Sequence, residues 1–103
     1  MIRHVFLWRV APTADPAKVL ALLSELPEHV PAIRNFALGK FRDDLGSPSF
    51  AWDYGLSCEF ETIGDLATYM EHPRHQEIIA QLDPMISDRA VCHFDAAGAA
   101  NQG

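Results

Sequence analysis

The segment at residues 69–75, YMEHPRH, gathers the side chains of this chain that are best suited to acid–base chemistry. It places Tyr69, His72 and His75 around Pro73, in a chain that has only five histidines. An imidazole changes its charge near neutral pH, so it is the side chain that most often serves as a general base. The segment raises three alternatives: a catalytic pair, part of a metal site, or a purely structural break between two helices.

Pro73 predicts that two helical pieces meet inside this segment. Proline has no backbone N–H and restricts the residue before it, so one helix should end there and another begin. Tyr69 lies on the apolar stripe of the first piece, and His75 shares the stripe of the second with Ile78 and Ile79. Both polar groups should therefore face the interior, where a small-molecule pocket would form. A structural role, with a buried tyrosine ring and a histidine bonded to a carbonyl, fits the same placement.

Histidines elsewhere bear on the metal alternative. His4 in the first expected strand and His93 in the last should be neighbours, and with His75 they would make a three-histidine set of the kind that zinc uses. Their spacing matches no compact zinc signature, so we expect no metal and no cofactor. Cys58 and Cys92 should lie on opposite faces of a sheet, as small buried hydrophobic residues without a disulfide.

The rest of the chain alternates strand and helix patterns. Strands are expected near residues 1–10, 33–41, 50–60 and 88–95, and helices near 15–26 and 62–82. Asp15 before Pro16 is typical of a helix start, and Thr62 with Asp65 forms a capping-box pattern. Pro27 is expected to end the first helix.

This element order predicts an α+β fold of the ferredoxin-like β-α-β-β-α-β type. Right-handed crossovers give an antiparallel sheet of order 4-1-3-2 with both helices on one face. Residues 1–95 should form a single domain. Residues 96–103 have no periodicity and are expected to be a mobile tail.

The first strand is apolar on both of its faces, although the helices can cover only one. An apolar sheet face without cover predicts a partner, and a second copy of the chain is the simplest one. We therefore expect a homodimer through the face opposite the helices. The residues expected on that face are Val5, Leu7, Ala90, Cys92 and Phe94.

Composition excludes several functional classes. The net charge of −6 and the pI near 5.1 disfavour nucleic acids and anionic membranes, which bind basic surfaces. No apolar run approaches the roughly 20 residues of a membrane span, and no signal-peptide pattern is present. A cytoplasmic location is therefore expected.

Three segments carry a resemblance to a known family: IRHVFLWRV at the start, VPAIRNFALGK after the first helix, and YMEHPRHQEI. Across residues 1–95 the chain resembles the stress-responsive α/β-barrel (Dabb) family. The resemblance implies a dimeric α+β barrel. One branch, that of plant olivetolic acid cyclase, closes a linear polyketide by aldol condensation without metal or cofactor. Similarity to that branch implies that Tyr69 and His75 carry the chemistry and that His4 lies in the pocket.

The chain departs from that branch at several pocket positions. Tyr54 replaces a pocket histidine and Leu23 replaces a pocket tyrosine, while Phe6 and Trp8 are bulkier than their counterparts. We therefore expect a smaller pocket, occupied by a small organic molecule that is bound and transformed by cofactor-free acid–base chemistry. A non-catalytic ligand-binding or structural dimer is the alternative. The residues expected to contact a substrate are His4, Phe6, Trp8, Leu23, Tyr54, Leu56, Ile78, Ile79 and His93.

Overall fold

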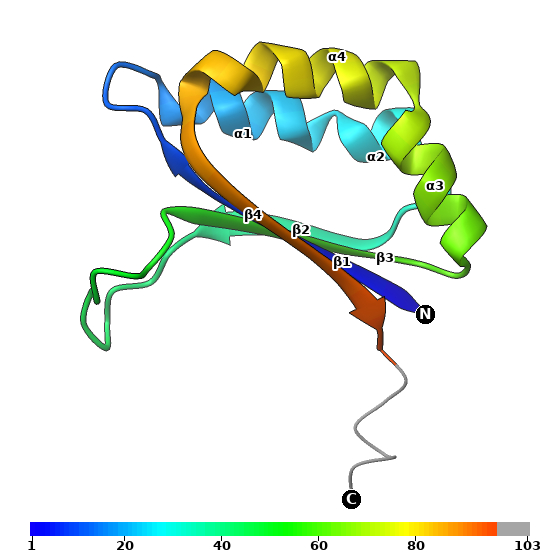
Figure 1. Cartoon of the computed structure of the whole chain (residues 1–103), viewed down its shortest axis with the longest axis horizontal. Helices are drawn as coiled ribbons and strands as arrows, with labels where there is room; N and C mark the ends of the chain where they lie inside the picture. Colours follow the sequence, from blue (N-terminus) through cyan, green and yellow to red (C-terminus); the bar gives the residue numbers. More distant parts are fainter. Residues whose placement is uncertain (97–103) are drawn as a thin grey trace, which may run out of the picture.

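A single antiparallel sheet carries the helices on one of its faces (Figure 1). The computed structural model describes residues 1–96; apart from Ala96, the tail expected to be mobile lies outside this range. The strands are β1 (Ile2–Val10), β2 (Arg34–Lys40), β3 (Tyr54–Phe60) and β4 (Ile86–Asp95). The helices are α1 (Pro16–Ser24), α2 (Leu26–His29), α3 (Ile63–Glu71) and α4 (Pro73–Leu82), followed by a 3₁₀ turn at Asp83–Met85. The strand order β2-β3-β1-β4 confirms the predicted ferredoxin-like topology.

Side-chain caps confirm two of the predicted helix starts. Asp15 accepts a hydrogen bond from the Ala17 N–H, and Thr62 accepts one from the Asp65 N–H. The predicted end of the first helix at Pro27 is wrong. Proline is tolerated in the first turn of a helix because its missing N–H would have no partner there, and Pro27 occupies that turn of α2.

The third strand begins later than predicted and the fourth begins earlier. The Ala51 N–H donates to the Pro48 carbonyl and closes a turn at residues 48–51, and residues 50–53 lie outside the strands, so β3 starts at Tyr54. Trp52, just before this strand, lies under the Arg9 guanidinium, whose Cζ is 4.3 Å from the centroid of the indole ring. At the other end of the chain, β4 starts at Ile86 instead of Asp88.

Pairing of β1 with β4 sets the two faces of the sheet. Opposite Cys92 and Ala90 lie Val5 and Leu7, on the face away from the helices. Within residues 1–96 nothing packs on that face, so Cys92 is exposed, contrary to its predicted burial. Cys58 is buried on the helix side, where burial raises the pKa of its thiol to about 12. Both thiols are free, as expected for opposite faces.

Over the described residues 1–96, none of the helices has the length and apolar character needed to cross a bilayer. The expected cytoplasmic location stays a prediction.

Candidate functional site

The break at Pro73 has the predicted form. His72 ends α3 in an extended conformation, and its Nδ1 accepts a hydrogen bond from the Arg74 N–H at 3.0 Å, which caps α4. This tight turn brings the last residues of α3 against the first turn of α4. The rings of Tyr69 and His75 lie 4.5 Å apart between centroids.

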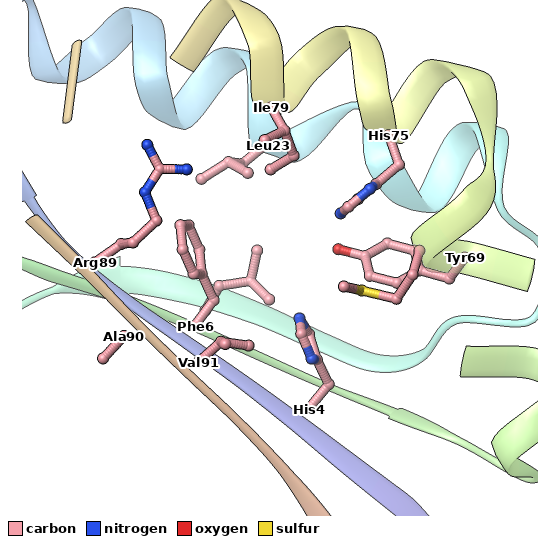
Figure 2. Close-up of a pocket in the computed structure, with 11 residues that line it drawn as sticks. His4, Phe6, Leu23, Tyr69, His75, Ile79, Arg89, Ala90 and Val91 are labelled. Atoms are coloured by element: carbon pink, nitrogen blue, oxygen red, sulfur yellow. The ribbon is translucent and has the colours of Figure 1, made fainter. Parts of the chain in front are cut away.

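A third ring joins this pair from the sheet. His4 on β1 packs edge-on against Tyr69, with 5.6 Å between the ring centroids. The side chains of His4, Tyr69 and His75 are all buried. Figure 2 shows the Tyr69 oxygen and the two imidazoles directed into one hollow, so three separate elements bring acid–base groups together at a single point.

This hollow is a pocket of about 230 Å³, bounded by helices above and by β1 and β4 below (Figure 2). Its walls are mostly hydrocarbon, apart from the three rings at one end and the Arg89 side chain at the other. Seven of the predicted site residues line it: His4, Phe6, Leu23, Leu56, Tyr69, His75 and Ile79.

Four of the predicted site residues do not line the pocket. Trp8 is fully buried, with its ring stacked between those of Phe6 and Tyr54 at 5.2 and 5.7 Å. Trp8 and Tyr54 are on the expected face of the sheet. Trp8 is four residues further along β1 than His4, however, which places it and its neighbour Tyr54 about 13 Å away from His4. Ile78 is fully buried in the core. His93 does not line the pocket, although its imidazole contacts that of His4.

Four lining residues were not predicted: Met70, Arg89, Ala90 and Val91. Three come from β4. Arg89 and Val91 face the helices, which leave this strand open, so Val91 is 57% exposed, whereas Ala90 lies between them with its side chain on the other face. In the register, Val91 is opposite Phe6 and Arg89 is opposite Trp8. The two-residue period counted back from His93 places both on the helix side, so the sequence held a signal for them.

Burial controls the charge of the cluster. It lowers the pKa of His4 to about 4, and the charges of His93 and His75 act in the same direction. Burial also lowers the pKa of His75, and the nearby Met70 carbonyl opposes this shift in part. That carbonyl is not in hydrogen-bonding geometry, so Nδ1 of His75 is buried without a partner among residues 1–96. Burial raises the pKa of Tyr69. At pH 7 the site therefore offers two neutral imidazoles and a protonated phenol.

His4 and His93 confirm the predicted cross-strand contact. Their Nδ1 atoms lie 3.4 Å apart, a distance at which one ring must donate and the other accept. In the described part of the chain, no group of three or more His, Cys, Asp or Glu side chains is arranged to hold a metal ion.

The burial of His4 makes stability depend on pH. The pKa of this imidazole is 6.5 in the unfolded chain and about 4 in the folded protein, so the unfolded chain binds the proton more readily. The contribution of His4 to the free energy of unfolding is therefore fully present above pH 6.5, and it is lost as the pH falls toward 4. A shift of this size corresponds to about 3 kcal/mol.

Urea unfolding at pH 7 and at pH 4.5 measures this loss. A His4→Gln variant, which cannot take up the proton, should show a much smaller change between the two values. An equal change in variant and wild type would contradict the assignment to His4.

Comparison with known proteins places the chain in a family. The model of the stress responsive A/B barrel domain, Dabb, matches residues 2–96. The chain belongs to the Dabb family. This confirms the resemblance seen in its sequence. None of the curated proteins matches the chain.

Several solved structures are similar to this Dabb chain. A dimeric ferredoxin-like protein of unknown function from Thermobifida fusca is 31% identical, with a TM-score of 0.74 over 90% of this chain and 88% of that one. A Dabb family protein from Mesorhizobium loti is 16% identical, with a TM-score of 0.70 over 90% and 93%. The hydroxynitrile lyase of Passiflora edulis is 13% identical, with a TM-score of 0.80 over 90% of each chain. At such low identity the last two show the shared fold alone.

Proposed function

We propose that this Dabb protein is a homodimer whose pocket binds a small organic carbonyl compound and removes a proton α to the carbonyl, without metal or cofactor. The observation that carries the proposal is the neutral imidazole of His75, whose buried Nδ1 has no partner within residues 1–96, beside the Tyr69 ring at one end of a small apolar pocket. A buried polar atom without a partner lowers the stability of the fold, so its presence calls for an explanation such as a functional role. Groups with shifted pKa values are common at functional sites.

The roles follow from the charge states. His75 takes the α-proton onto its imidazole, and the electron pair of the broken C–H bond moves to the carbonyl oxygen as an enolate. Tyr69, which stays protonated, donates a hydrogen bond to that oxygen, and His4 orients the substrate. The imidazolium of His75 then returns its proton to carbon or oxygen, which completes an isomerase-, lyase- or cyclase-like step.

Pocket size restricts the substrate. A volume of about 230 Å³ lies below the roughly 300 Å³ at which ordinary ligand pockets begin. It favours a molecule much smaller than a long-tailed polyketide. The same observation favours a second candidate function, a dimer that binds a small molecule without transforming it.

Deuterium incorporation separates the two candidates. Small 3-oxo thioesters and quinone-like compounds would be incubated with the protein in D₂O and followed by proton NMR. Enzyme-dependent exchange at the α-carbon supports catalysis. Because burial lowers the pKa of His75, the exchange rate should be level near pH 7 and fall only below pH 6.5. Binding shifts without exchange of any compound would favour the second candidate.

The homodimer is supported by the uncovered face of the sheet. Val5 and Leu7 are only half-buried there, beside the small residues Ala37, Gly39 and Gly55 of a shallow apolar depression. The Thermobifida fusca relative is described as dimeric. A second copy packed face to face would cover both depressions at once.

Replacing Leu7 with glutamate should break such a dimer. A carboxylate buried between two apolar sheets costs several kcal/mol, so the dissociation constant should rise by about 100-fold or more. Sedimentation velocity over a range of protein concentrations measures it. Ile63→Glu is the matched control, because Ile63 is an exposed apolar residue at the start of α3, away from that face. Equal behaviour of the two variants would count against this interface.

A further inference from the structure

Arg89 provides the one charged side chain among the described residues that line the pocket. It lies at the end of the pocket away from Tyr69 and His75 (Figure 2). Arg89 is paired with Trp8 of β1, which is four residues, or about 13 Å, along the strand from His4. The pocket therefore has an acid–base end, an apolar middle and a cationic end.

The Arg89 guanidinium keeps hydrogen-bonding capacity for a ligand. Its Nη2 donates to Asp83 at 2.8 Å, and the Asp83 side chain is 75% exposed. Nε and Nη1 have no partner within residues 1–96. An exposed ion pair is weak, so Asp83 holds the group in place without saturating its donors. The neighbouring acid, Asp88, is engaged by Arg9 at 3.2 Å.

The middle of the pocket selects for hydrocarbon. Phe6, Leu23 and Ile79 form its walls between the two polar ends, and Leu56 also lines the pocket. A ligand that satisfies all three regions carries an anionic group at one end and a short apolar body. Its reactive group then reaches the rings of Tyr69 and His75. A planar guanidinium matches the planar geometry of a carboxylate.

We infer that Arg89 binds the carboxylate of the ligand, so that the ligand of this pocket is a small monocarboxylic acid. The inference rests on the proposed function for the orientation of the reactive group toward His75. The carboxylate contact itself depends only on Arg89. It makes Arg89 a specificity-determining residue that discriminates an acid from its neutral amide.

Hexanoate and hexanamide are suitable probes, since they have the same shape and differ in charge. Their dissociation constants would be measured on the full chain by titration, following backbone amide shifts of the pocket residues by NMR. Wild type should bind hexanoate about tenfold or more tightly than hexanamide. Arg89→Gln should reduce this ratio to about one, and Arg89→Lys should keep part of it, because lysine is a point charge without the planar fork.

Asp83→Asn is the matched control, because it breaks the same ion pair as Arg89→Gln. If Arg89 binds the carboxylate, releasing the guanidinium from Asp83 should tighten hexanoate binding several-fold, whereas Arg89→Gln weakens it. If Arg89 has only a structural role, the two variants should weaken binding alike. That result, or an unchanged hexanoate-to-hexanamide ratio in Arg89→Gln, would overturn the inference.

A His75→Ala variant separates this inference from the proposed function. The binding ratio should be the same in His75→Ala as in wild type, since the ratio reports on the other end of the pocket. A ratio that depends on Arg89 while no compound exchanges deuterium would leave the inference standing and overturn catalysis. If deuterium exchange depends on His75 but the hexanoate-to-hexanamide ratio does not depend on Arg89, catalysis is supported and the inference about Arg89 is overturned.

Discussion

His75→Ala is expected to slow α-proton exchange of a substrate by about 10²- to 10⁴-fold, the contribution of one positioned general base. The variant removes the imidazole whose Nδ1 is buried without a partner, and leaves the Tyr69 ring in place beside an empty space. Exchange is followed by proton NMR in D₂O at pH 7. Added imidazole should restore part of the rate, because it can occupy the space that the side chain left.

The controls distinguish loss of the base from loss of the fold. His29→Ala removes an exposed histidine that pairs with Glu25 at 3.8 Å, and it should leave exchange unchanged. Tyr69→Phe should lose less than His75→Ala, since it removes a hydrogen-bond donor and not the proton acceptor. Unaltered exchange in His75→Ala, with the protein folded, would exclude His75 as the base.

Trp8→Ala is expected to lower the free energy of unfolding by about 3–5 kcal/mol, the cost of removing a large buried ring. Trp8 has no exposed surface and stacks on both Phe6 and Tyr54. A domain of this kind is stable by only about 5–15 kcal/mol, so the variant should lose a large fraction of its stability. Urea denaturation at a fixed protein concentration measures the change.

Trp8→Phe is the informative comparison. The indole N–H of Trp8 is buried without a partner within residues 1–96. Phenylalanine removes this unpaired donor, whose burial is unfavourable, while it keeps most of the stacking. We therefore expect Trp8→Phe to cost much less than Trp8→Ala. A small effect of Trp8→Ala would mean that this ring is not a main support of the core.

The sequence by itself determined the topology and the central pair of the site. Alternating apolar residues defined the two faces of β1, and Asp15 and Thr62 marked two helix starts through caps that depend on residues only two or three positions away. Pro73 separated α3 from α4 for an equally local reason. Because these signals are local, the meeting of Tyr69 and His75 at the break was also predictable.

Only the tertiary structure decided how far the pocket extends along the sheet. Periodicity assigns a side chain to a face, but it does not state which part of that face the helices cover. Trp8 and Tyr54 stand on the predicted face yet lie in a ring stack beyond the pocket, while Arg89 and Val91 line it because the helices leave β4 open. The neutral state of His4 has the same origin, since it follows from burial beneath Tyr69 and beside His93, residues far from it in sequence.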